Sequence, residues 1–292
     1  MKNNTFALSL LLFLIFGSSK LVASPQMPDY IIYKSDTVAT YNLLVEQYLQ
    51  NQHQADSGKL FGLSFREGAS FNCWRGYQAI YKVENDSLFL VNMIGCGTLL
   101  NKNADRASDN KMMQAIFGGR LINGKVFINW FSGDINFPLN KNLIRWDGVF
   151  RRIYEKERVI KLAAGKVIKT EDVINYIDNP KSIDRKYGTS ISDIFFDKIK
   201  RIKWKNIKDC DCSAKYIITI NQEGKVSKIK SPEQEDGDSD DKAEGALCKS
   251  KIFAALSKLR FDVIKDKGKP MAENVYMEIW IEENGKIENW TR

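Results

Sequence analysis

Short runs rich in apolar, β-branched and aromatic residues, bounded by Gly, Asn and Asp, follow one another along much of the chain. Such runs occur at residues 77–83, 87–94 and 157–162. Runs of this length and composition between turn-forming residues are typical of strands. The pattern therefore predicts an α+β fold in which residues 24–188 form a β-rich, antiparallel N-terminal domain.

Helices are predicted where apolar residues recur every three or four positions. Residues 190–205 show this spacing most clearly, with Ser190 in place to cap the helix. Their apolar stripe consists of Ile191, Ile194, Phe195, Ile199 and Ile202. The opposite face is rich in lysine, which would suit an anionic membrane surface, but such helices more often pack the stripe into a core. Shorter helices are expected at residues 37–50, 112–117, 170–176 and 246–259.

The C-terminal region has a more specific pattern. Residues 214–229 predict a strand, a Gly-bearing turn and a returning strand. The turn contains Glu223-Gly224-Lys225-Val226, and a second motif, Gly268-Lys269-Pro270-Met271, precedes a β-branched and aromatic strand at residues 274–281. This order of motifs resembles the C-terminal domain of TonB-like proteins. Residues 260–262 depart from the family pattern, because they are Arg-Phe-Asp where the family often has Trp and Pro.

The resemblance covers about residues 206–292 and implies a small α+β C-terminal domain. With the leading amphipathic helix included, the predicted domain spans residues 189–292. In the TonB-like family this domain pairs a short segment of an outer-membrane transporter onto a sheet edge and transmits force from an inner-membrane complex. By that likeness, residues 274–281 would form an open edge that accepts a strand. The side chains that would select the partner are Tyr276, Glu278 and Trp280. Alternatively, residues 282–292 fold back as a hairpin and cover the edge.

The N-terminal region has a cluster of aromatic and arginine residues in two phrases, CWRGY at residues 73–77 and WFSG at residues 130–133. These phrases look like those of exported bacterial proteins of uncharacterised function. Because Trp, Tyr and Arg predominate at binding hot spots, the cluster is a candidate surface for a ligand or partner. The candidate residues are Trp74, Arg75, Tyr77 and Trp130. Burial beside a disulfide is the other interpretation.

The N-terminus has the layout of a secretory signal. Lys2 precedes an apolar run at residues 6–17, and small residues lead up to Ala23. Because this run is shorter than the ~20 residues that span a bilayer, cleavage after Ala23 is favoured over a retained membrane anchor. We therefore expect a signal peptide at residues 1–23 and an exported protein, periplasmic or secreted.

The formal net charge of the chain is +8. Loss of Lys2 and Lys20 with the signal lowers the charge to about +6, which favours acidic surfaces without identifying one. Nucleic acid is not an expected partner outside the cell. We expect the partner to be an envelope or outer-membrane protein.

Five cysteines are present, and an export route makes disulfides the default expectation. They are Cys73, Cys96, Cys210, Cys212 and Cys248. Cys73 and Cys96 lie at almost equal distances from the turn at residues 84–86, so a hairpin about this turn would bring their sulfurs together. One of Cys210 and Cys212 is expected to join Cys248, and the sequence leaves open which one. A three-thiolate metal site is less favoured, because it lacks a fourth ligand.

Motifs for catalysis or cofactor binding are sparse. His53 is the one histidine of the chain, which excludes multi-histidine zinc sites. Residues 119–125 match the start of a phosphate-binding loop, but Val126 stands where the Ser or Thr that holds magnesium would be. We therefore expect no cofactor, and the leading hypothesis is an exported, non-catalytic binding module.

Two alternative functions stay open. The first is a carboxylate-dependent hydrolase of envelope polymers, which needs two acidic residues about 5 to 10 Å apart in the N-terminal domain. Its candidate residues are Asp134, Asp147, Glu155 and Glu157. The second is a TonB-type energy transducer that keeps its N-terminal helix as an anchor.

Overall fold

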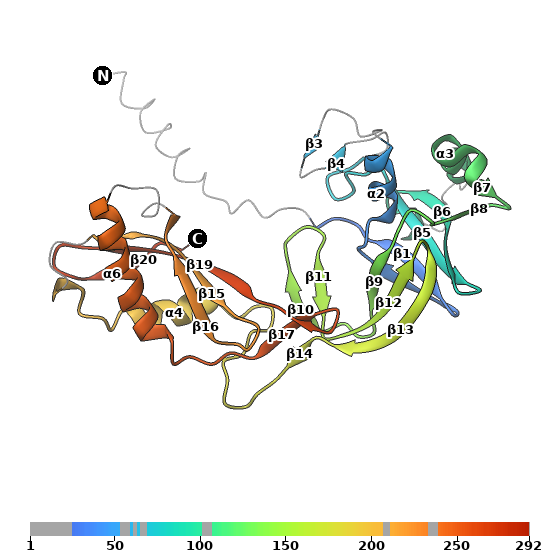
Figure 1. The fold of residues 1–292 in the computed structure, drawn as a ribbon. Helices are drawn as coiled ribbons and strands as arrows, with labels where there is room; N and C mark the ends of the chain where they lie inside the picture. The colour runs from blue at the N-terminus through green and yellow to red at the C-terminus, as the bar shows by residue number, and fades with distance from the viewer. Residues whose placement is uncertain are drawn as a thin grey trace, which may run out of the picture.

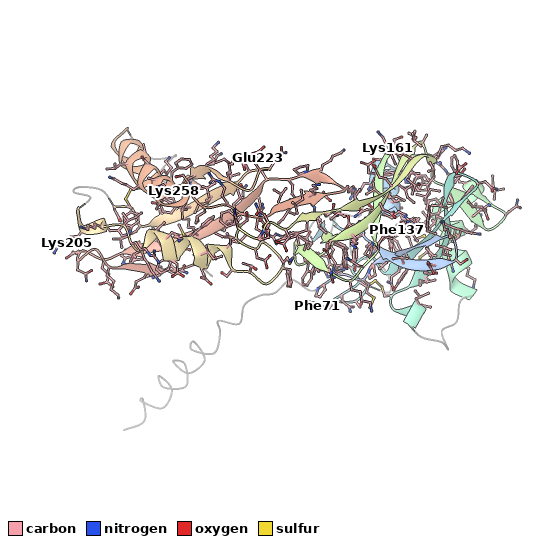
Figure 2. The ribbon with its side chains drawn as sticks, turned by 90° about the horizontal axis from the view of Figure 1, so that it is seen from below. Phe71, Phe137, Lys161, Lys205, Glu223 and Lys258 are labelled. Carbon is pink, nitrogen blue, oxygen red and sulfur yellow. A yellow bond between two sulfur atoms is a disulfide. The ribbon has the colours of Figure 1, made fainter. Side chains whose placement is uncertain are left out.

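The structure is a computed structural model of the 292-residue chain. It describes residues 25–52, 59–60, 63–64, 69–100, 107–206, 211–232 and 239–291. The predicted signal peptide, residues 1–23, lies outside the described residues. Within them, no helix is long and apolar enough to cross a membrane. The fold is mixed α+β with mostly antiparallel sheets, as predicted, and the two largest sheets lie toward opposite ends of an elongated molecule (Figure 1, Figure 2).

The larger sheet is built from the N-terminal region. Its main path is β2-β1-β5-β6-β13-β12-β9, with β7 and β8 beside β6. Neighbouring strands are antiparallel except β1 and β5. The strands are β1 (Asp29–Tyr33), β2 (Asp36–Thr40), β5 (Tyr77–Glu84), β6 (Ser87–Gly95), β7 (Leu121–Ile122), β8 (Lys125–Phe127), β9 (Gly133–Pro138), β12 (Lys156–Ala163) and β13 (Lys166–Ile174).

Two helices, α2 (Leu44–Asn51) and α3 (Ala107–Phe117), pack against this sheet. Their buried side chains, Leu49 and Phe117 among them, join those of the strands in one hydrophobic core. Short elements outside the sheets discussed in this section are β3 (Lys59–Leu60), β4 (Leu63–Ser64), η1 (Thr98–Leu100), η2 (Gly118–Arg120) and η3 (Trp204–Asn206).

Three predicted elements of this region differ from the structure. The helix predicted at residues 37–50 is a strand followed by a shorter helix, because Asp36–Thr40 pairs with β1. The helix predicted at residues 170–176 is mostly the end of β13, whose β-branched residues pair with β12. Finally, α3 begins at Ala107, five residues before the helix predicted at residues 112–117, and residues 101–106 lie outside the described part of the chain.

The second sheet belongs to the C-terminal region and has the order β16-β15-β19-β20. Helices α4 (Ile191–Ile199) and α6 (Ser239–Leu256) share one core with it, in which Phe195, Tyr216 and Met277 are buried. The strands are β15 (Ala214–Ile220), β16 (Val226–Lys230), β19 (Glu273–Ile281) and β20 (Ile287–Asn289). The predicted hairpin of residues 214–229 is therefore present as β15 and β16.

Smaller sheets lie between the two large ones (Figure 1). One has the order β14-β17-β18, and the other pairs β10 with β11. A small core of Ile144, Ile153, Tyr176 and Ile264 joins them. The strands are β10 (Leu143–Trp146), β11 (Arg152–Tyr154), β14 (Tyr176–Ile177), β17 (Val263–Asp266) and β18 (Lys269–Pro270). Because β14 pairs with β17, elements on both sides of residue 188 share a sheet, and the division into two domains there stays a prediction.

Glu273 ties this middle part to the C-terminal sheet. Its carboxylate accepts hydrogen bonds from Arg145 Nε at 2.6 Å and from Arg185 Nη2 at 2.8 Å. Arg185 is completely buried and also donates to the backbone oxygen of Asp262. Burial acts to raise the pKa of Glu273, but the two arginines outweigh it and hold the pKa below its usual value. The first residue of β19 is thus fixed by charges from two other segments.

Candidate functional site

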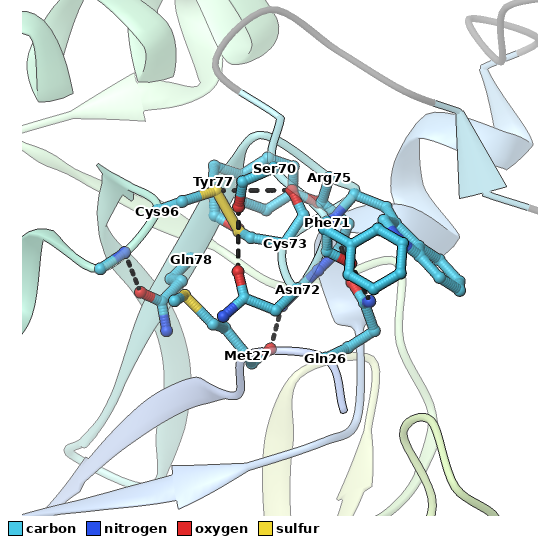
Figure 3. Close-up of a disulfide and its surroundings, with 12 residues drawn as sticks. Gln26, Met27, Ser70, Phe71, Asn72, Cys73, Arg75, Tyr77, Gln78 and Cys96 are labelled. Carbon is cyan, nitrogen blue, oxygen red and sulfur yellow. Dashed lines mark hydrogen bonds between the residues drawn. A yellow bond between two sulfur atoms is a disulfide. The ribbon is translucent and has the colours of Figure 1, made fainter. Parts of the chain in front are cut away.

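Two disulfides are present in the described part of the chain. Cys73 bonds Cys96 with a Cα–Cα distance of 6.1 Å, and closes the open end of the β5–β6 hairpin as the sequence predicts (Figure 3). Cys212 is the residue that bonds Cys248, with a Cα–Cα distance of 5.5 Å. The second bond ties the segment before β15 to α6. Both bonds are consistent with an oxidising compartment.

The CWRGY segment, residues 73–77, lies in the interior. Trp74, Arg75 and Tyr77 are 4%, 1% and 2% exposed, so these predicted binding residues do not form an accessible surface. The reason is an ion pair in which Arg75 Nη1 lies 2.6 Å from Asp29 Oδ1, at the start of β1. Arg75 Nη2 also donates to the backbone oxygen of Met27 at 2.8 Å. The segment therefore holds the N-terminal strand to the sheet.

Burial dominates the electrostatics of this segment. It raises the pKa of Asp29, and the charge and hydrogen bonds of Arg75 act in the opposite direction. It also raises the pKa of Tyr77, which donates a short hydrogen bond to Glu46 of α2, and that of Tyr81. The partners of these groups come from β1, β5 and α2, which indicates a structural network.

Trp130, the fourth candidate of the N-terminal cluster, is half-buried. Its Nε1 donates to the backbone oxygen of Leu44 at 3.1 Å, and its ring stacks on Phe117 with centroids 5.9 Å apart. The guanidinium of Arg120 lies over the same indole at 5.4 Å. Trp130 thus joins α2 and α3 to the sheet, and its indole is largely used by the fold.

The C-terminal sheet presents its aromatic residues to solvent. Tyr276, Trp280 and Trp290, called the aromatic face below, are 66%, 45% and 48% exposed. Trp280 and Trp290 stack with ring centroids 5.3 Å apart. The neighbouring residues of β19, Met277 and Ile279, are buried on the opposite face with α4 and α6. Tyr276 and Trp280 were predicted, whereas Trp290 was not, because its place depends on the fold-back of the chain after β19.

The predicted open edge at residues 274–281 is partly covered. β19 pairs with β15 on one side, and on the other Ile279–Ile281 pairs with β20. The fold-back alternative is therefore correct for the last three residues of β19. β20 contains only Ile287–Asn289 and does not reach the first half of β19. In the described part of the chain, no strand pairs with residues 273–277 on the side of β19 opposite β15.

The backbone direction of β19 identifies the groups at this uncovered edge. The oxygen of Glu278 accepts the Trp290 amide at 2.9 Å, so the backbone groups of Glu278 point toward the β20 side. Because successive residues of a strand alternate, the N–H and C=O of Tyr276 point to the same side, beyond the end of β20. A hollow of about 210 Å³ lies there, lined by Tyr216, Tyr276 and Thr291 among others. Glu278 is half-buried beside it.

A larger cleft of about 440 Å³ lies between the N-terminal sheet, β11 and the end of β17. Three of the four carboxylates predicted for a hydrolase, Asp134, Asp147 and Glu157, line it, together with Asp266. The fourth, Glu155, is not among its lining residues and accepts hydrogen bonds from Asn140 and Asn142.

Most carboxylates of this cleft are held by fixed donors. Glu157 is 0% exposed and accepts hydrogen bonds of 2.9 Å each from the Tyr154 amide, Asn136 and Asn175. Burial raises its pKa, and these donors act against that shift. Asp147 accepts the amides of Val149 and Phe150 at 2.8 and 2.9 Å. Asp134 makes a long ion pair, 3.9 Å, with Lys269.

These contacts weaken the hydrolase hypothesis, since an acid/base pair needs two carboxyl groups that face one substrate. Among the four carboxylates that line the cleft, only that of Asp134 makes no short hydrogen bond with the described residues. Among the same residues, no group of three His, Cys, Asp or Glu side chains could hold a metal ion.

No protein-family model, no curated protein and no solved structure matches the chain. The resemblance to TonB-like proteins therefore stays a prediction from the turn motifs of the sequence.

Proposed function

We propose that this protein is an exported binding module without catalytic activity, and that its C-terminal sheet binds an extended segment of an envelope protein. One observation carries the proposal: exposed aromatic rings lie beside a strand edge that is uncovered in the described residues. Trp and Tyr are frequent at binding hot spots, and an uncovered edge offers backbone hydrogen bonds to an added strand.

The added strand would continue the line of β20 along residues 273–277 of β19. At about 3.3 Å per residue, an incoming segment of four or five residues would fill this edge. Its backbone would bond the N–H and C=O of Tyr276, and one of its side chains would enter the hollow beside Tyr216. Lys215 and Glu278 on the rim of the hollow would favour a segment with complementary polar groups.

Two further features support the proposal. The disulfides fit an oxidising compartment, as expected of an exported chain. The resemblance to TonB-like proteins indicates the same style of binding, a short segment paired onto a sheet. The related hypothesis of an anchored energy transducer requires residues 1–23 to be retained, which mass analysis of the N-terminus of the exported protein would decide.

The decisive variants change Tyr276. Tyr276→Ala removes the ring and keeps the backbone N–H, whereas Tyr276→Pro also removes the N–H that points to the uncovered edge. Neither variant touches the ladder to β15, in contrast to Met277→Pro, which would remove an N–H directed at β15 from a buried residue. Tyr187→Ala is the matched control, since Tyr187 is also an exposed tyrosine, at 56% against 66% for Tyr276, and lies outside this sheet.

The measurement is quantitative capture of envelope proteins on residues 24–292, followed by titration of a synthetic segment of the captured protein. We expect Tyr276→Ala to weaken binding of that segment about tenfold, and Tyr276→Pro to abolish it. Tyr187→Ala should bind like the unaltered protein. Equal binding by Tyr276→Pro and the unaltered protein would refute strand addition at this edge.

Hydrolysis of envelope polymers is the second candidate, favoured only by the shared cleft of Asp134, Asp147 and Glu157. Incubation of the protein with purified cell-wall polymer should release fragments if this function is correct. Asp134→Asn should then abolish the release, while Glu155→Gln, outside the cleft, should leave it unchanged.

A further inference from the structure

The cleft of about 440 Å³ contains a cation without a counter-ion. Arg152 of β11 lines it, and in the described part of the chain its guanidinium makes no hydrogen bond and no ion pair. Its Nη1 is buried without an acceptor, as is Nε1 of Trp146, the residue opposite Arg152 on β10. The guanidinium lies 4.3 Å from the ring centroid of Tyr41 and 5.2 Å from that of Trp146.

Arg152 differs in this respect from the other basic residues of the cleft, Arg151 and Lys267. Arg151 pairs with Asp266 at 2.8 Å, and Lys267 donates to the backbone oxygen of Asp134 at 2.7 Å. Burial lowers the pKa of Arg152, and no carboxylate among the described residues forms an ion pair with its guanidinium. A partly buried cation without an anion is costly, so a bound anion would stabilise it, and a perturbed group of this kind in a cleft marks a candidate binding site.

The lining restricts the class of ligand. The volume suits a small molecule, and Phe131, Phe150 and Tyr41 offer aromatic surface for a ring. The carboxylates of Asp134 and Asp147 accept hydroxyl donors but would repel a phosphate ester, which carries nearly two negative charges. A bare carboxylate such as acetate would leave most of the cleft unused.

We propose that this cleft binds a small saccharide that carries one carboxylate, with the carboxylate on Arg152 and sugar hydroxyls on Asp134 and Asp147. The apolar face of the sugar ring packs against Phe131 or Phe150. The site is independent of the aromatic face, because the two share no residue.

The test uses residues 24–292 and four probes: glucuronate, glucose, acetate and glucose 6-phosphate. Saturation-transfer NMR and the melting temperature report binding. We expect glucuronate to bind and to raise the melting temperature with increasing concentration, and the other three probes to give little response. No response to glucuronate would overturn the proposal, as would an equal or larger response to glucose, acetate or glucose 6-phosphate.

Arg152→Gln should weaken glucuronate binding about tenfold or more, since a charge-assisted bond is lost. The melting temperature of this variant without ligand should change little, because the substitution removes no hydrogen bond or ion pair within the described residues and only the stacking on Tyr41 and Trp146. Arg158→Gln is the control, as Arg158 already pairs with Asp172 at 2.6 Å. Arg152→Lys keeps the charge and should bind with intermediate strength. Unchanged binding by Arg152→Gln would overturn the role of Arg152.

Discussion

The CWRGY segment and the aromatic face contain similar residue types in opposite environments. Trp74 and Tyr77 are buried, whereas Tyr276 and Trp280 are exposed. The ion pair of Arg75 with Asp29 and the Cys73–Cys96 disulfide hold the CWRGY segment in the interior. Tyr276 and Trp280 of the aromatic face belong to β19, whose other face already supplies Met277 and Ile279 to the core. The residue types alone therefore do not predict a binding surface. Whether an aromatic side chain is buried or exposed depends on the contacts of the residues beside it in the chain.

The largest effect is expected from Asp29→Asn, which leaves Arg75 charged and buried without its counter-ion. Loss of one partner of a buried ion pair costs about 3–5 kcal/mol of the free energy of unfolding. Urea denaturation measures the loss. Asp172→Asn is the control, since Asp172 is half exposed and its pair with Arg158 should contribute less than about 1 kcal/mol. Similar losses in both variants would contradict a structural role for the CWRGY segment.

A direct comparison of the two regions comes from Trp74→Ala and Trp280→Ala. Truncation of the buried Trp74 should cost about 3–5 kcal/mol, since it leaves a cavity. Truncation of Trp280 should cost only about 1 kcal/mol, mostly the stacking with Trp290. Denaturation of both variants measures the difference. Binding of the captured segment should fall only with Trp280→Ala, and a loss of binding by folded Trp74→Ala would contradict this division of roles.

Local patterns allowed much of the fold to be predicted. The β15–β16 hairpin follows from its β-branched runs and from the turn at Gly224, whose φ of +72° favours glycine. A Cβ at Gly224 would also lie 2.1 Å from the backbone oxygen of Phe261, so the turn motif has a packing reason. The Cys73–Cys96 bond followed in the same way from its position around the β5–β6 turn.

Features that depend on distant segments were not predictable from local sequence. The predicted helix at residues 170–176 is mostly strand because β12 pairs with it, and burial of Arg75 depends on Asp29, 46 residues earlier in the chain. The cleft at Arg152 combines residues from Ala39 to Lys267, so no spacing could reveal it. The partial cover of β19 was only one of two alternatives, because a fold-back depends on the pairing of three residues.

Glu273→Gln tests whether β19 depends on the middle part of the molecule. The variant should lose about 2 kcal/mol, less than a fully buried pair, because the Glu273 side chain is 23% exposed. Since the folded pKa of Glu273 lies below the usual 4.5, its contribution is complete above that value and is lost as the pH falls through the folded pKa. Denaturation at several pH values between 7 and 3 measures how the free energy of unfolding declines with pH. An equally steep decline in Glu273→Gln would exclude Glu273 as the cause of that pH dependence.

The smallest effect needs no mutation and concerns hydrogen exchange along β19. The Tyr276 amide should exchange rapidly because it points to the uncovered edge, while the amides of Val275 and Met277 point to β15 and should be protected. NMR of the free protein measures these rates residue by residue. Addition of the captured segment should slow exchange at Tyr276 and leave Val275 almost unchanged. If Tyr276 is already protected in the free protein, the edge is covered, and binding would have to use the aromatic side chains alone.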